Sequence, residues 1–192
     1  MFIDYLTLVM INMVAGTFIL AYYLWKGMDE QDQRPYAAAF FGVGLLSLVT
    51  GLHLSFTWPL PGSYNVGYGD TTTLFGIVFL ATAISLWQGW QLGPVAIYAF
   101  FAGIDAVIVG FRIYSLQMTK EPLLSAIGFI LAGLGGLGAA PFFMWFKENR
   151  TVRMAGALLL LATALLWAVT FYGSLWAHLD SFSKWLPPTM GK

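Results

Sequence analysis

Residues 50–64, TGLHLSFTWPLPGSY, take the chain from the inside of an apolar run to a membrane surface. Trp58 is of a residue type that is enriched where a transmembrane helix meets the lipid headgroups. Pro59 and Pro61 follow directly, and proline breaks a helix because it lacks the backbone N–H. The stretch therefore predicts the end of a membrane-spanning helix, with the imidazole of His53 just inside the bilayer boundary.

The composition extends this prediction to the whole chain. Of its 192 residues, 59% are hydrophobic and only 9% are charged, whereas a soluble domain carries roughly 25% charged residues. We therefore expect an integral membrane protein whose partner is the lipid bilayer. Nine basic and nine acidic residues balance, so no positive field points to nucleic acid as a partner. The chain contains no cysteine, which excludes disulfides and thiolate metal sites.

Six apolar runs have about the 20 residues that are needed to span a bilayer. They cover residues 5–25, 37–58, 72–90, 94–116, 122–146 and 152–178. Short connections with proline, glycine and charged residues separate the runs. The prediction is an all-α fold: a polytopic membrane protein in which residues 1–192 form a single domain, a bundle of six transmembrane helices.

Two segments outside these runs carry further expectations. Residues 59–70 form a long connection that could cover a cavity, and Asp70 at its end is expected to cap the third helix. Residues 180–188 alternate aromatic and polar side chains, which is typical of a segment that lies on the membrane surface.

The lysine and arginine residues favour one orientation in the membrane. One side collects Lys26, Arg34, Lys147, Arg150 and Arg153, and the other collects Arg112, Lys120, Lys184 and Lys192. Because cytoplasmic loops carry an excess of basic residues, we expect both termini on the non-cytoplasmic side.

Small residues recur at every fourth position of the fifth run: Gly128, Ala132, Gly136 and Ala140. Such a ridge lets two helix backbones approach closely in lipid. It indicates helix packing in the first place. It is also a candidate surface for a second copy of the chain or for a partner in a membrane complex.

Alternation of the helices brings many ionisable residues to one side of the membrane. The second, fourth and sixth helices end on that side, where the first, third and fifth helices begin. The residues concerned are His53, Arg112, His178, Asp4, Glu121 and Asp180. We expect a polar site near the non-cytoplasmic face.

The two histidines are candidate ligands. Imidazole is a usual ligand for haem and for divalent metals in a site without cysteine, so His53 and His178 could hold either cofactor. Asp4, Asp180 or Glu121 would then complete a metal shell. The alternative for His53 is an interfacial histidine that is hydrogen-bonded to water or to its own helix.

A second polar pattern follows the fourth run. Tyr98, Asp105 and Arg112 recur at every seventh residue and therefore share one helix face. A charged aspartate near mid-membrane costs about 2.5–3.5 kcal/mol on insertion scales. Asp105 is therefore either a structural group in an ion pair or hydrogen bond, or a carboxylate that handles protons or ions. Asn12 of the first run could join such a path.

Three stretches of the chain resemble an uncharacterised family of small prokaryotic membrane proteins with six helices, a domain of unknown function. They are residues 51–65, 94–103 and 181–185. The resemblance implies a multi-pass protein of a bacterial or archaeal plasma membrane, and it implies no activity, cofactor or catalytic residue.

Functions of different classes fit these patterns, and no motif names a reaction. The first is a haem- or metal-binding redox subunit in electron transport, with Arg112 facing a propionate or an anionic substrate. The alternative is a small transporter or channel in which Asp105 and Arg112 line the path. A third is a structural subunit of a membrane complex.

Overall fold

The computed structural model describes residues 6–183, and within them the chain is helical, with no strand. The helices are α1 (Leu6–Trp25), α2 (Arg34–Thr57), α3 (Tyr64–Gln88), α4 (Gly93–Ser115), α5 (Pro122–Pro141) and α6 (Arg150–Ser181). A short 3-10 turn η1 (Gly27–Asp29) follows α1, and a π-helical turn η2 (Phe142–Phe146) continues α5. The prediction of an all-α bundle of six membrane-spanning helices is confirmed for this part of the chain.

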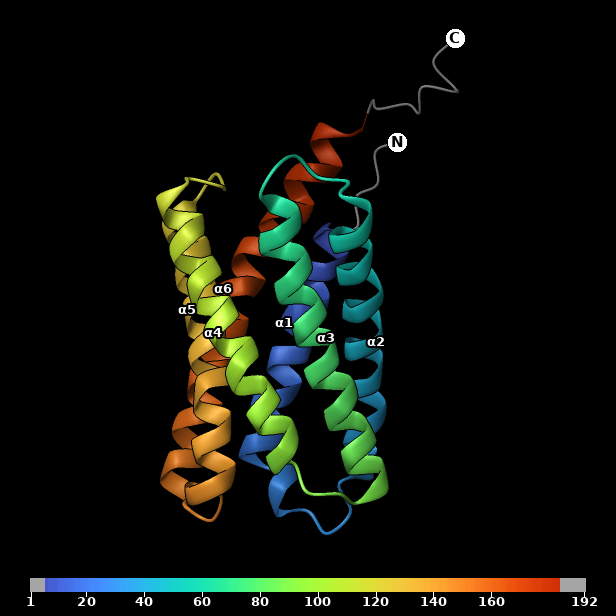
Figure 1. Ribbon diagram of the computed structural model, residues 1–192, viewed down its shortest axis with the longest axis vertical. Coiled ribbons are helices and arrows are strands. Elements are labelled where there is room, and N and C mark those ends of the chain that lie inside the picture. The colour runs from blue at the N-terminus through green and yellow to red at the C-terminus, as the bar shows by residue number, and fades with distance from the viewer. Residues whose placement is uncertain (1–5, 184–192) are drawn as a thin grey trace.

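The six helices form a bundle of antiparallel neighbours (Figure 1). The tightest contacts join α2 to α3, α4 to α5, and α1 to α6. We call the end at which α1 begins and α6 ends the terminal side, and the other end the distal side. Large apolar side chains such as Phe18, Leu158 and Val169 are exposed on the outside of the bundle, as expected for a surface covered by lipid.

Glycines allow the backbones of α2 and α3 to touch. A methyl group added to Gly44 would lie 2.6 Å from the backbone nitrogen of Leu80, and one added to Gly76 would lie 2.5 Å from that of Leu48. Such distances are far below van der Waals contact, so only glycine fits at either position. Close approach of two backbones through small residues, which the sequence predicts for the fifth run, thus also occurs between α2 and α3.

The small-residue ridge of α5 is occupied within the same chain. A methyl group added to Gly136 would lie 2.7 Å from the carbonyl oxygen of Ala99 on α4. Gly128 lies directly against the indole of Trp167 on α6. The suggestion that this ridge receives a partner subunit is corrected by these contacts, and any contact with another copy has to use the outer faces of the bundle.

The third helix begins at Tyr64, eight residues before the predicted start. Asp70 is consequently no N-cap: it lies inside α3 and accepts a hydrogen bond from Ser55 Oγ of α2 (3.0 Å). Gly67 and Gly69 belong to the predicted connection of residues 59–70. In the bundle Gly69 provides close contact, since a methyl group there would lie 2.7 Å from Ser55 Oγ.

Asn65 closes the short connection that remains between α2 and α3. Its side chain is fully buried. The amide oxygen accepts from the Leu60 N–H (2.8 Å), and the amide nitrogen donates to the carbonyls of Leu60 and Gly62. One side chain thus satisfies backbone groups that would otherwise be unpaired at the membrane boundary.

The C-terminal prediction is tested only in part. α6 continues as a helix to Ser181, so the first two residues of the predicted surface segment belong to the last helix. Residues 184–188 and Asp4 lie outside the residues that the structure describes.

An ion pair fixes the distal side of the bundle. Both guanidinium nitrogens Nη1 and Nη2 of Arg153 donate to the carboxylate of Asp29, at 2.5 and 2.7 Å. Arg153 is buried at the start of α6, and Asp29 belongs to η1. The bidentate contact therefore ties the α1–α2 connection to the last helix.

We expect Gly44→Ala to lower the free energy of unfolding by about 1–3 kcal/mol, because the added methyl group overpacks the α2–α3 contact. Gly42→Ala is the matched control on the same helix, since a methyl group there meets nothing within 4 Å. Thermal unfolding of the detergent-purified variants measures the difference. Equal melting temperatures for the two variants would contradict the close contact.

The ion pair predicts a loss of stability in acid. The hydrogen bonds from Arg153 lower the pKa of Asp29 below its ordinary value. A carboxylate with a lowered pKa in the folded protein stabilises it at neutral pH, and this contribution is lost as the pH falls below about 4. The Asp29→Asn variant should melt below the wild type at pH 7, and the gap should shrink as the pH falls below 4. Glu148→Gln is the control and should leave the melting curve unchanged, because the Lys147–Glu148 pair is exposed and 3.8 Å long.

Candidate functional site

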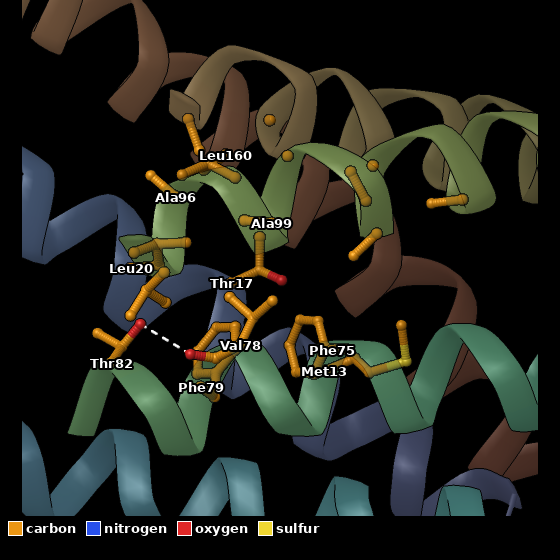
Figure 2. Close-up of a pocket in the computed structure, with 18 of the residues that line it drawn as sticks. Met13, Thr17, Leu20, Phe75, Val78, Phe79, Thr82, Ala96, Ala99 and Leu160 are labelled. Atoms are coloured by element: carbon orange, nitrogen blue, oxygen red, sulfur yellow. Dashed lines mark hydrogen bonds between the residues drawn. The ribbon is translucent and has the colours of Figure 1, made fainter. Parts of the chain in front are cut away.

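A cavity of about 150 Å³ lies along the middle of the bundle. Its lining residues come from α1, α3, α4, α5 and α6, while none of those described belongs to α2. Figure 2 shows labelled side chains of α1, α3, α4 and α6 around this space. An apolar cavity of similar volume in another protein holds a benzene molecule, so this space has room for a small solute.

Small residues create the space and aromatic rings shape it. The small residues stand on facing sides of α4 and α5: Ala96, Ala99, Ala102, Gly103, Ala106, Ala132, Gly135, Gly136 and Ala139. The rings are those of Tyr23, Phe75, Phe79, Phe129, Phe143 and Trp167. The lining is therefore mostly apolar.

Threonine hydroxyls supply polarity in the cavity wall. Thr71 Oγ1 donates to the Gly67 carbonyl (2.6 Å), and Thr82 Oγ1 donates to the Val78 carbonyl (2.8 Å; Figure 2). Each hydroxyl oxygen keeps acceptor capacity after its proton is used in this way. Thr17 of α1 also lines the cavity. Within residues 6–183, no lysine, arginine, histidine, aspartate or glutamate is among the lining residues.

The cavity reaches from the distal side to the middle of the bundle. Leu92, just before α4, lines its distal end, and Phe129 and Trp167 line its inner end. The indole of Trp167 is nearly fully buried, and its Nε1–H has no hydrogen-bond acceptor among the described residues. This nitrogen lies against Gly128 of α5, which is not among the lining residues of the cavity.

Aromatic rings pack together from the inner end of the cavity toward the terminal side. They belong to Tyr68, Phe129, Trp167 and Phe171. Successive ring centroids along this series are 5.9, 6.1 and 5.6 Å apart. Leu54, fully buried, packs against Tyr68 and Phe129 in the same cluster. These rings and Leu54 therefore form packed apolar contacts at the inner end of the cavity and beyond it.

The two histidines have separate partners in the structure. His178 Nδ1 lies 2.8 Å from Thr7 Oγ1, which joins α6 to α1. His53 is exposed on α2, with its Nε2 atom 3.4 Å from Thr57 Oγ1 one turn away. Over residues 6–183, no three histidine, aspartate or glutamate side chains are grouped so as to hold a metal ion. A haem or metal site at these residues stays a prediction.

The charged residues predicted beside the histidines are exposed. Arg112 lies in the last turn of α4, Glu121 immediately precedes α5, and Asp180 lies near the end of α6. The terminal side therefore carries these charges on its surface. Across the described chain, none of the three lines the cavity.

The polar stripe of α4 also lies away from the cavity. Tyr98 and Arg112 are exposed, and Asp105 is half-buried. The predicted ion pair between Asp105 and Arg112 is absent from the ion pairs of residues 6–183. Asn12 has a packing role, because its amide donates to the Val43 carbonyl and to Ser47 Oγ of α2, both at 2.9 Å.

The sequence does not predict that the cavity residues form a site, because each is an ordinary component of a packed helix. Alanine, glycine and phenylalanine carry no chemical motif. One signal was available: Ala96, Ala99, Ala102 and Ala106 recur at three- and four-residue spacing and mark one small-residue face of α4. That face could equally have been filled by a neighbouring helix.

Fold and cavity together define a six-helix membrane protein with a cavity between its helices whose described lining carries no charged residue. The chain belongs to a family described as "Protein of unknown function (DUF981)", whose profile matches residues 1–181. This confirms the resemblance to an uncharacterised family. No curated protein matches the chain.

Two solved structures share the fold. One is the crystal structure of the urea channel from the human gastric pathogen Helicobacter pylori, with 20% identity and a TM-score of 0.69 over 94% of this chain and 99% of that one. The other is a cryoEM structure of the Helicobacter pylori urea channel in a closed state, with 22% identity and a TM-score of 0.63 over 85% and 97%. At these identities the likeness shows the shared fold alone.

Proposed function

We propose that this protein is a passive channel for small, uncharged polar solutes of the size of urea, in the plasma membrane of a prokaryotic cell. The observation that carries the proposal is the cavity, which is lined by apolar and hydroxyl groups and lies between five of the six helices. The fold that the chain shares with a urea channel supports it.

The chemistry of the lining favours neutral solutes over ions. An ion that entered would lose its hydration shell, and the described lining offers neither an opposite charge nor a ring of carbonyl groups to replace it. A neutral amide needs only a few hydrogen bonds. The hydroxyl oxygens of Thr71 and Thr82 can accept such bonds.

This proposal differs from the ion path suggested by the sequence. That path required Asp105 and Arg112 to line the route. The described cavity is lined by neither residue, and Arg112 is exposed at the end of α4. A neutral-solute route through the cavity needs no charged residue, so it fits the observed lining better.

Stopped-flow light scattering on proteoliposomes tests the function. We expect urea to enter faster than through protein-free vesicles, whereas guanidinium, which has a similar shape and a positive charge, should enter no faster than through lipid alone. Equal entry of both would contradict selection by an uncharged cavity. An absence of urea entry above the lipid background would overturn the proposed substrate class.

A cavity-filling variant locates the path. Ala102→Leu places three more carbon atoms in the cavity and should lower urea entry by about tenfold or more, the effect of raising a barrier by roughly 1.4 kcal/mol. Ala162→Leu on the exposed face of α6 makes the same change outside the cavity and should leave entry unchanged. Equal rates for both variants would place the path elsewhere.

We further propose that the distal side faces the cytoplasm, because Lys26, Lys147 and Arg150 lie there. The chain has no cysteine, so single cysteines report orientation cleanly. Ser63→Cys on the terminal side should react with an impermeant maleimide added to intact cells. Gln31→Cys on the distal side should react only after permeabilisation, and the reverse pattern would invert the assigned orientation.

A further inference from the structure

The cavity-facing side of α5 ends in a large side chain. Between Phe129 and Phe143, the lining residues of α5 are all small: Ala132, Gly135, Gly136 and Ala139. Their spacing of three and four residues keeps them on one face of the helix. The cavity is therefore wide along this face and meets the ring of Phe143 at its distal end.

Other large apolar side chains line the same end. Leu24 is next to the last residue of α1, Leu92 directly precedes α4, and Val95 belongs to the first turn of α4. All of them lie at the distal ends of their helices, as Phe143 does. This group therefore lies between the small-residue part of the cavity and the distal surface.

An irregular backbone segment holds Phe143 in place. It belongs to the π-helical turn Phe142–Phe146, which begins directly after Pro141. Such turns are rare and are found frequently at functional sites. Phe142 is buried, and its ring meets that of Phe143 edge-on with centroids 5.0 Å apart. The other three residues of the turn, Met144, Trp145 and Phe146, are exposed.

We infer that Phe143 sets the size limit for solutes at the distal mouth of the cavity. The inference rests on the proposed channel function and adds a specificity-determining residue to it. The ring lies where the lining changes from small to large residues, and its buried neighbour Phe142 keeps it there. Removal of the ring should widen the mouth for larger solutes more than for urea.

The experiment compares urea, methylurea and 1,3-dimethylurea entry into proteoliposomes. It uses the wild type, Phe143→Ala, Phe143→Leu and the control Trp145→Ala, which removes an exposed ring from the same turn. One methylene group in an apolar pocket discriminates by about tenfold or more. We therefore expect Phe143→Ala to raise the ratio of dimethylurea to urea entry by roughly tenfold, with Phe143→Leu between it and the wild type and Trp145→Ala at the wild-type ratio.

The outcomes separate this inference from the proposed function. An unchanged ratio in both Phe143 variants, with urea entry above the lipid background, overturns the size limit and leaves the channel standing. An equal rise in Trp145→Ala also overturns it, because the turn as a whole would then be responsible. If Phe143→Ala fails to fold, the ratio in Phe143→Leu decides. If the wild type admits no urea, the channel itself is overturned.

Discussion

Direct contact between helix backbones is the interaction on which the rest of the structure depends. Gly44 and Gly76 allow α2 and α3 to touch, and Gly103 and Gly136 do the same for α4 and α5. In lipid, helices gain from association mainly through such close packing, because lipid tails are as apolar as the side chains. The two tight pairs can then leave space between them, and the cavity lies where α1, α3, α4, α5 and α6 meet.

The six spans could be predicted because length and hydropathy decide whether a segment crosses a bilayer. The start of α3 could not be predicted in the same way. Gly67, Gly69 and Asp70 indicate a loop in water, whereas in the bundle Gly69 gives close contact with α2 and Asp70 bonds to Ser55. Local sequence does not say which helix will lie beside a glycine.

The cavity could not be predicted from the sequence either, because it too depends on which helices lie side by side. Charged and titratable residues are the usual sign of a site in a membrane protein, since they are costly in lipid and usually have a role. Asn12 proves to tie α1 to α2, and His178 lies beside Thr7 of α1. The cavity is lined mostly by alanine, glycine, aliphatic and aromatic residues, none of which belongs to a recognisable sequence motif. Its existence depends on how far apart the helix pairs stand, which is a property of the whole bundle.

The few hydroxyl groups of the cavity wall favour weak binding of a polar solute over tight binding. Conduction requires that a solute bind well enough to enter and weakly enough to leave. The hydroxyls of Thr71 and Thr82 donate to carbonyls of their own helix, so they offer a solute only acceptor oxygens. A net hydrogen bond to such an oxygen contributes about 0.5–1.5 kcal/mol. A lining charge would hold a polar solute far more tightly, because charged partners act strongly in a space that excludes water. Among the described residues the shortest ion pair, that of Arg153 with Asp29, lies at the distal surface, away from the cavity lining.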